Sequence, residues 1–198
     1  MLEYFEYISL LLGLVLGFLI GYSIFRRKIR KMEIQSKEDY LTKIANYREF
    51  DKQLSIYIHQ FKKRSRHFSL ALIDLDGFKK INDNYGYEAG DSVIMECAEL
   101  IRSNIRVGDQ VFRYKHGDEF AVMFPGVLAK GARKASERIK ETIKQHRFQL
   151  PQQSVNLTAS IGLVSIDQEE LKKKELKQTL EKALREAKKK GDSIFISE

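Results

Sequence analysis

Two aspartates close the most apolar strand-like segment of the sequence, and two lysines follow shortly after them. Residues 68–75 read FSLALIDL, so Asp74 and Asp76 stand at the end of this run, with Lys79 and Lys80 just downstream. Carboxylates at an open strand end suit Mg²⁺ that is bound jointly by acids and by the phosphates of a substrate. A D-x-D pair after a strand is also a common turn signal, so both interpretations stay open at this point.

A second acidic pair, Asp118 and Glu119, lies in a compact polar turn between two short strand patterns at residues 110–114 and 120–124. Such a pattern predicts a hairpin. If this hairpin neighbours the strand at residues 68–75, all the acids converge at one edge of a sheet. The arrangement could then activate a 3′-hydroxyl and stabilise a leaving pyrophosphate, by the logic of in-line phosphoryl displacement at metal ions.

The elements that must position these groups follow from the hydrophobic periodicity. Helical spacing is found over residues 46–63, 88–106, 128–147 and 169–190, and strand patterns over residues 68–75, 110–114, 120–124, 155–165 and 193–197. This order predicts one α/β (α+β) domain with helices packed around a mixed, mainly antiparallel sheet. The single cysteine, Cys97, falls on the apolar face of its helix, which predicts a buried core position and excludes an internal disulfide.

An uncharged apolar segment, residues 8–25, precedes the domain and is close to the length needed to cross a bilayer. Glu3 and Glu6 stand before it and a basic cluster follows, which favours an uncleaved anchor over a signal peptide. We therefore expect a single-pass protein of the inner (cytoplasmic) membrane, with its C-terminal domain in the cytoplasm. The expected parts are an extracytoplasmic tail, a transmembrane helix, a basic helical connector and a globular domain, at residues 1–7, 8–25, 26–38 and 39–198.

The net charge of +8 indicates a binding partner only through the positions of the basic residues in the chain. Part of it lies in the connector at residues 26–38 and part in the last helix, and no aromatic ladder accompanies either cluster, so nucleic acid is not an expected partner.

Gly13, Gly17 and Gly21 share one face of the apolar helix, where two chains could pack closely. Glycine is also simply common in membrane helices, and both explanations remain.

Several spaced motifs appear in one order along the chain: DYLTKIAN at residues 39–46, LIDLDGFKKIND at residues 72–83, Gly90-Asp91, and RYKHGDEF at residues 113–120. Together they resemble a GGDEF domain, the family of diguanylate cyclases, over about 160 residues from Asp39 onward. The resemblance implies a nucleotidyl-cyclase-like fold and a metal site for Mg²⁺ or Mn²⁺.

The resemblance assigns the acids to metal binding and catalysis. Asp74 and Asp118 would bind the cation through their carboxylates, with the Leu75 carbonyl completing the site. Glu119 would act near the 3′-hydroxyl as a base or as a further metal ligand.

The remaining substrate contacts follow from the same resemblance. Asn82 and Asp91 would read guanine, since a carboxylate accepts from the N1 and N2 donors of the base. Lys79 and Lys188 would neutralise the triphosphate, Lys79 as part of the catalytic set, and the other substrate contacts would be Gly77, Phe78 and Gly117. Two of these residues have plain alternatives: Lys188 lies among other lysines on a solvated helix face, and Asn82 could be only a turn residue.

The segment Arg106-Val-Gly-Asp109 resembles the inhibitory RxxD site of the family, where cyclic di-GMP binds as product. An arginine can bridge phosphate and guanine edges while the aspartate accepts from the base.

The resemblance breaks at the signature loop. Lys115-His116-Gly117 stands where the family has two glycines, so one glycine is replaced and one residue is added. Because glycines let a backbone approach phosphates, His116 and the altered turn length could crowd the substrate. His116 could also serve as a ligand or proton carrier, although a loop histidine usually does neither. Tyr87 stands where histidine is frequent in the family.

Two functions remain in view. The first is a homodimeric diguanylate cyclase, in which each chain holds one of two GTP molecules and the pair becomes cyclic di-GMP and two pyrophosphates. The second is a catalytically degenerate module that binds GTP or cyclic di-GMP as a signalling receptor.

Overall fold

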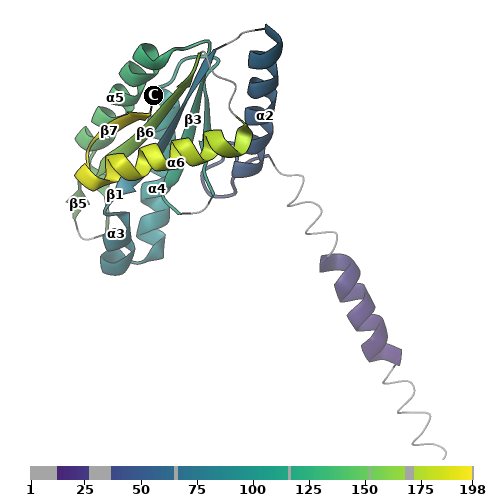
Figure 1. Cartoon of the computed structure of the whole chain (residues 1–198). Helices are drawn as coiled ribbons and strands as arrows, with labels where there is room; N and C mark the ends of the chain where they lie inside the picture. The colour runs from purple at the N-terminus through teal and green to yellow at the C-terminus, as the bar shows by residue number, and fades with distance from the viewer. Residues whose placement is uncertain are drawn as a thin grey trace, which may run out of the picture. The chain divides into compact units, whose positions relative to one another are not determined.

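The computed structural model describes residues 13–26, 37–64, 67–115, 117–151, 153–167 and 172–197. The chain divides into two compact units, Met1–Ser36 and Lys37–Glu198. In the first unit, residues 13–26 form a helix (Figure 1). The side chains of this helix are exposed. Within the described ranges, no helix combines the length and the apolar character needed to cross a membrane. The predicted span at residues 8–25 and the connector at residues 26–38 lie partly outside these ranges, so both stay predictions.

The second unit is built on a five-stranded sheet with the order β2-β3-β1-β6-β7. Its strands are β1 (Phe68–Asp76), β2 (Gln110–Arg113), β3 (Glu119–Pro125), β6 (Thr158–Ile166) and β7 (Ile194–Ser197). The strand pairs β2–β3, β3–β1 and β1–β6 are antiparallel, and the β6–β7 pair is parallel. The expected mixed, mainly antiparallel sheet is therefore confirmed. A separate small ribbon pairs β4 (Phe148–Gln149) with β5 (Ser154–Val155).

Helices cover both faces of this sheet. One face packs against α2 (Tyr47–Arg64) and α6 (Lys173–Lys190), and the other packs against α4 (Tyr87–Ser103) and α5 (Ala129–Gln145). The short α3 (Phe78–Tyr85) follows β1 and packs against α4. Figure 1 shows α6 crossing the sheet on one side, with α5 on the other.

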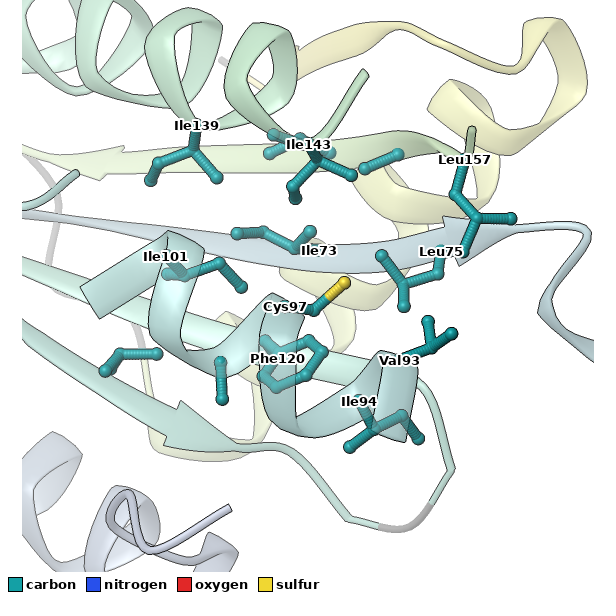
Figure 2. Packing of buried hydrophobic residues seen from close by; sticks show 14 of the residues in the cluster. Ile73, Leu75, Val93, Ile94, Cys97, Ile101, Phe120, Ile139, Ile143 and Leu157 are labelled. Atoms are coloured by element: carbon teal, nitrogen blue, oxygen red, sulfur yellow. The ribbon is translucent and has the colours of Figure 1, made fainter. Parts of the chain in front are cut away.

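The central strand β1 explains why its sequence is an uninterrupted apolar run. Its residues are buried on both faces: Leu70 and Leu72 pack toward α2 and α6, while Ile73 and Leu75 pack toward α4 and α5. A strand covered on both sides loses the polar alternation of a half-exposed strand. Figure 2 shows Cys97 of α4 among the second group, so its predicted core position is confirmed.

A close approach of α6 to β6 depends on Gly162. A Cβ atom at this position would lie 2.2 Å from the backbone nitrogen of Leu184, far inside contact distance. No side chain larger than hydrogen fits between strand and helix here. The contact fixes how α6 lies on the sheet, and hence where the lysines at its C-terminal end project.

Two element predictions need correction. The single strand expected at residues 155–165 is two strands, β5 and β6, which are separated by Asn156 and Leu157. Helix α3 was not expected, because eight residues are too few for a clear helical period. It begins directly after Gly77, whose φ of 75° lies in the left-handed region, and it buries Phe78 and Ile81.

Candidate active site

The acids at the ends of β1 and β3 do converge. The two strands are direct neighbours, and Asp74 lies opposite Glu119 in their register. Asp118 precedes Glu119 and lines, together with Asp74, a cleft of about 620 Å³. The walls of this cleft come from the end of β1, the start of α3, the signature loop and the end of α6.

Asp74 is the most buried of these acids, with 4% of its surface exposed. Its Oδ2 atom accepts a hydrogen bond of 2.8 Å from the Lys188 ammonium, while its Oδ1 atom is buried and has no partner among the described residues. Burial raises the pKa of the Asp74 carboxyl, and the hydrogen bond from Lys188 opposes this only in part. A buried carboxylate oxygen without a donor is the position at which a cation is most useful.

The negative charge of Asp74 acts on the two neighbouring acids, Asp118 and Glu119. Burial raises the pKa of Asp118 and of Glu119, and the negative charge of Asp74 raises both further. Clustered carboxylates with raised pKa values fit a divalent cation, because the cation removes their repulsion. Within the described residues, no three metal-ligating side chains are grouped closely enough to hold an ion by themselves. A cation here would therefore need further oxygens, from the Leu75 carbonyl and from substrate phosphates.

Asp76 lines the same cleft, but its carboxylate has other partners. Its carboxylate accepts hydrogen bonds from the hydroxyls of Thr158 and Ser160, both at 2.7 Å, and from the backbone N–H of Asp192 at 2.9 Å. Three donors thus occupy the group, which ties β1 to β6 and to the turn that follows α6. Asp76 thus lies at the same edge of the sheet as Asp74, as expected, but its carboxylate is engaged by donors of the protein.

The cleft offers donors for phosphate next to the acids. Gly77, Phe78 and Lys79 line it at the start of α3, where no side chain of the described residues caps the free backbone N–H groups. The exposed Lys79 projects from this turn, and Lys188 reaches the same cleft from α6. A helix start flanked by ammonium groups is favourable for anions.

A second, smaller pocket of about 320 Å³ adjoins the first through Phe78, which lines both. Asn82 of α3 and Asp91 of α4 line this second pocket, as the sequence predicts for residues that act together. Gly90 makes the arrangement possible, since a Cβ atom there would lie 1.9 Å from Oδ1 of Asn82. Of the predicted substrate residues, Gly77, Lys79 and Lys188 thus line the first pocket, and Asn82, Asp91 and Gly117 the second.

Arg113, whose role no sequence motif predicts, joins the signature loop to the second pocket. Its buried guanidinium donates to the carbonyl of Gly117, lies 3.9 Å from Asp39 and stacks over the ring of Phe120. Burial lowers the pKa of Arg113, and the charge of Asp39 opposes this. Its place at the end of β2, directly before the loop, was the only signal in the sequence.

Lys115, which departs from the family pattern in the signature loop, is held by α6. Its ammonium donates to Glu181 at 2.5 Å, and the hydroxyl of the buried Tyr114 donates to the same carboxylate oxygen at 2.9 Å. The backbone at Lys115 has φ of 51°, a conformation that a glycine adopts without strain. Lys115 also lines the second pocket, while the prediction for His116 falls outside the described residues.

The RxxD segment forms a tight turn at the far end of the β2–β3 hairpin. Arg106 donates through Nε to Asp109 at 3.0 Å and through Nη2 to the carbonyl of Pro125 at 2.6 Å. The two residues are therefore together and partly paired with each other, and product binding to them stays a prediction.

Comparisons with known proteins agree with this geometry. Residues 36–193 match the family described as "Diguanylate cyclase, GGDEF domain". An uncharacterized membrane protein of Staphylococcus epidermidis is 32% identical over 145 residues, which is 73% of this chain and 40% of that protein. The chain thus spans less than half the length of this curated relative.

Two solved structures share the fold. One is the diguanylate cyclase SiaD of Pseudomonas aeruginosa in complex with its activator SiaC, with a TM-score of 0.78 and 22% identity over 98% of this chain and 75% of that chain. The other is the coiled coil and GGDEF domain of DgcB from Caulobacter crescentus in complex with c-di-GMP, with a TM-score of 0.77 and 21% identity over 94% of this chain and 99% of that chain.

Proposed function

Since this chain belongs to the family of GGDEF diguanylate cyclase domains, we propose that it condenses two GTP molecules into cyclic di-GMP and two pyrophosphates. The observation that carries the proposal is the pair of adjoining pockets. One is lined by acids and lysines and suits a triphosphate with its cation, and the other is lined by Asn82 and Asp91 and suits a base. Phe78 lines both, so a single nucleotide can occupy the two.

The metal would be held by the carboxylates of Asp74 and Asp118 and by the carbonyl of Leu75. The partnerless Oδ1 atom of Asp74 and the raised pKa values of the acids support this assignment. Mg²⁺ or Mn²⁺ bound there neutralises phosphate charge and favours departure of pyrophosphate.

Glu119 is the group proposed to take a proton from the attacking 3′-hydroxyl. Its pKa is raised by burial and by the charge of Asp74, which makes it a better proton acceptor than an exposed carboxylate. Lys79 and Lys188 would bind the triphosphate. Lys188 is paired with Asp74 at 2.8 Å, and we expect its ammonium to shift to phosphate when the cation takes its place on the carboxylate.

Guanine recognition is proposed for Asn82 and Asp91. The Asp91 carboxylate accepts from the N1 and N2 donors of guanine, and the Asn82 amide can donate to O6. Adenine lacks the N1 donor, so the same pair favours guanine.

A homodimer is part of the proposal, because each domain holds one GTP and supplies half of the reaction. Anchoring at the inner membrane through residues 8–25 is a further part, supported by the name of the staphylococcal relative as a membrane protein. Gly13, Gly17 and Gly21 could then bring two anchors together.

The test is to incubate the full chain in detergent micelles with GTP and Mg²⁺ and to separate the nucleotides by chromatography. We expect cyclic di-GMP from the wild type, none from Asp118→Asn, and wild-type yield from Asp83→Asn, an exposed neighbour that lines neither pocket. Wild-type yield from Asp118→Asn would refute the metal assignment.

The alternative is a degenerate GGDEF module that binds GTP or cyclic di-GMP as a receptor. The signature loop, in which one glycine is replaced and one residue is added at Lys115-His116-Gly117, favours it. A folded, dimeric wild type that makes no product but binds either nucleotide in calorimetry would establish the alternative and exclude the enzyme.

A further inference from the structure

Two tyrosines stand at the mouth of the second pocket with their rings largely uncovered. Tyr40, from the turn before α2, and Tyr87, the first residue of α4, both line the pocket, and each has 81% of its surface exposed. The apolar floor is different, since Phe78 and Ile94 are 7% and 3% exposed. The lining of the pocket thus combines buried apolar side chains with two largely exposed aromatic rings.

Among the described residues, the electrostatic partner of Tyr40 is Arg113, which lines the same pocket, and neither tyrosine ring packs against another aromatic ring. The aromatic pairs of the described residues involve other side chains, and no hydrogen bond joins either tyrosine hydroxyl to a described residue. Large aromatic surfaces that remain open beside a pocket typically mark a binding site. The two tyrosines come from segments far apart in sequence, Tyr40 before α2 and Tyr87 after α3, so helical or strand periodicity does not account for their meeting at one pocket.

The size of the pocket decides which part of a ligand it can take. At about 320 Å³ it lies at the small end for ligand sites, which suits a planar base better than a whole nucleotide triphosphate. Asn82 and Asp91, which are proposed to read the base, would contact its edge, and edge contacts leave the two flat faces of the ring unaccounted for.

We propose that Tyr40 and Tyr87 stack on the purine of the bound nucleotide and hold it while Asn82 and Asp91 read its edge. The inference rests on the proposed function for the location of the base. The stacking adds two contacts to the proposed nucleotide site. These contacts do not select a particular base, because every base has a π-face on which an aromatic ring can stack. Recognition would then be divided: the rings supply affinity, and the polar pair supplies the preference for guanine.

The first test separates the base from the phosphates. The full chain in detergent micelles with Mg²⁺ is titrated with α,β-methylene GTP, which cannot release pyrophosphate, and separately with tripolyphosphate, which has no base. Tyr87→Leu and Tyr40→Leu should each weaken binding of the GTP analogue about tenfold. Both should bind tripolyphosphate within about twofold of the wild type, since the lysines and acids are unchanged. Tyr87→Phe, which keeps the ring, should bind the analogue as the wild type does.

The second test reads stacking directly. The chain has no tryptophan, so Tyr87→Trp introduces the only one. A guanine stacked on this indole should quench its fluorescence in a saturable way, at the concentrations at which calorimetry detects binding. Phe195→Trp on β7 is the control: its ring is also partly exposed, it lines a different pocket, and its fluorescence should not respond.

The outcomes distinguish this inference from the proposed function. If the leucine variants bind the analogue as tightly as the wild type, the stacking inference is overturned and the cyclase proposal stands. If they weaken self-association in sedimentation and leave nucleotide affinity unchanged, the tyrosines belong to a contact between two copies, and the inference is equally overturned. If the variants lose the analogue selectively while the wild type makes no cyclic di-GMP, the stacking is supported and the enzymatic proposal fails.

Discussion

Replacing Glu119 by glutamine should make the metal-free protein more stable. Glu119 lies directly opposite Asp74 on neighbouring antiparallel strands, and carboxylates in that position repel each other. Two unit charges about 5 Å apart repel by roughly 3 kcal/mol at an effective dielectric constant of 20. The Lys188 ammonium, 2.8 Å from Asp74, cancels much of this, so we expect a net gain of about 1 kcal/mol in the free energy of unfolding.

The pH dependence of stability independently gives the sign of the change in the free energy of unfolding. The pKa of Glu119 is raised in the folded protein, by burial first and by Asp74 second. A carboxyl group of this kind contributes stability below its ordinary pKa, and that stability is lost as the pH rises through the raised value. The wild type should therefore lose stability relative to Glu119→Gln as the pH increases from about 4 toward neutrality.

The assay is urea unfolding of residues 37–198, which contain both hydrophobic clusters, followed by circular dichroism in the presence of a chelator. Glu181→Gln is a control with the same chemical change and the opposite expected sign. Burial opposes ionisation of Glu181, but hydrogen bonds from Lys115 and Tyr114 lower its pKa overall. Because this pair is partly exposed, the loss should be only about 0.5 kcal/mol.

The reasoning about the acidic cluster would be refuted by a Glu119→Gln protein that is less stable than the wild type at pH 7, or whose stability follows the wild-type pH curve without a divergence. An equal shift in Glu181→Gln would point to a general effect of removing negative charge, and would refute the assignment equally.

Two further substitutions test the framework around the site, both by urea unfolding. Gly162→Ala should lower the free energy of unfolding by about 3 kcal/mol, because the added methyl meets the backbone of Leu184. The control Gly131→Ala meets only a movable side chain and should cost far less. Similar losses of stability in both variants would refute the close approach of α6 to β6. Asp76→Ala should cost about 3 kcal/mol, since three donors lose a charged acceptor, while Mg²⁺ should still stabilise the variant; loss of the Mg²⁺ effect would return Asp76 to the cation site.

Part of the site could be recognised from local pattern alone. The run FSLALIDL predicts a strand covered on both faces, and β1 is such a strand, with Asp74 at its end. The hairpin that carries Asp118 and Glu119, and the helices that carry Asp91 and Lys188, also follow from periodicity. Patterns of two and of 3.6 residues report which face of an element is buried, and this information is contained in each segment by itself.

The tertiary structure decided which hydrogen-bond partners the carboxylates of Asp74 and Asp76 have. Both aspartates end the same strand two residues apart, yet one has a partnerless oxygen in a cleft and the other is saturated by donors. The donors come from β6 and from the turn after α6, more than eighty residues away along the chain. Whether a carboxylate is free for a cation depends on which distant groups reach it, and no local pattern contains that information.

The signature loop shows the same division. Its sequence shows that one glycine is replaced and one residue is added, which predicts that His116 and the altered turn crowd the substrate. The fold adds that Glu181 of α6 lies within hydrogen-bond distance of Lys115, and Arg113 against the carbonyl of Gly117. The sequence determined which residue types stand in the loop. The packing of α6 against the sheet, which depends on the close contact at Gly162, decided which partners their charged groups have. The reason is that an ion pair between distant segments forms only after the backbone has brought them together.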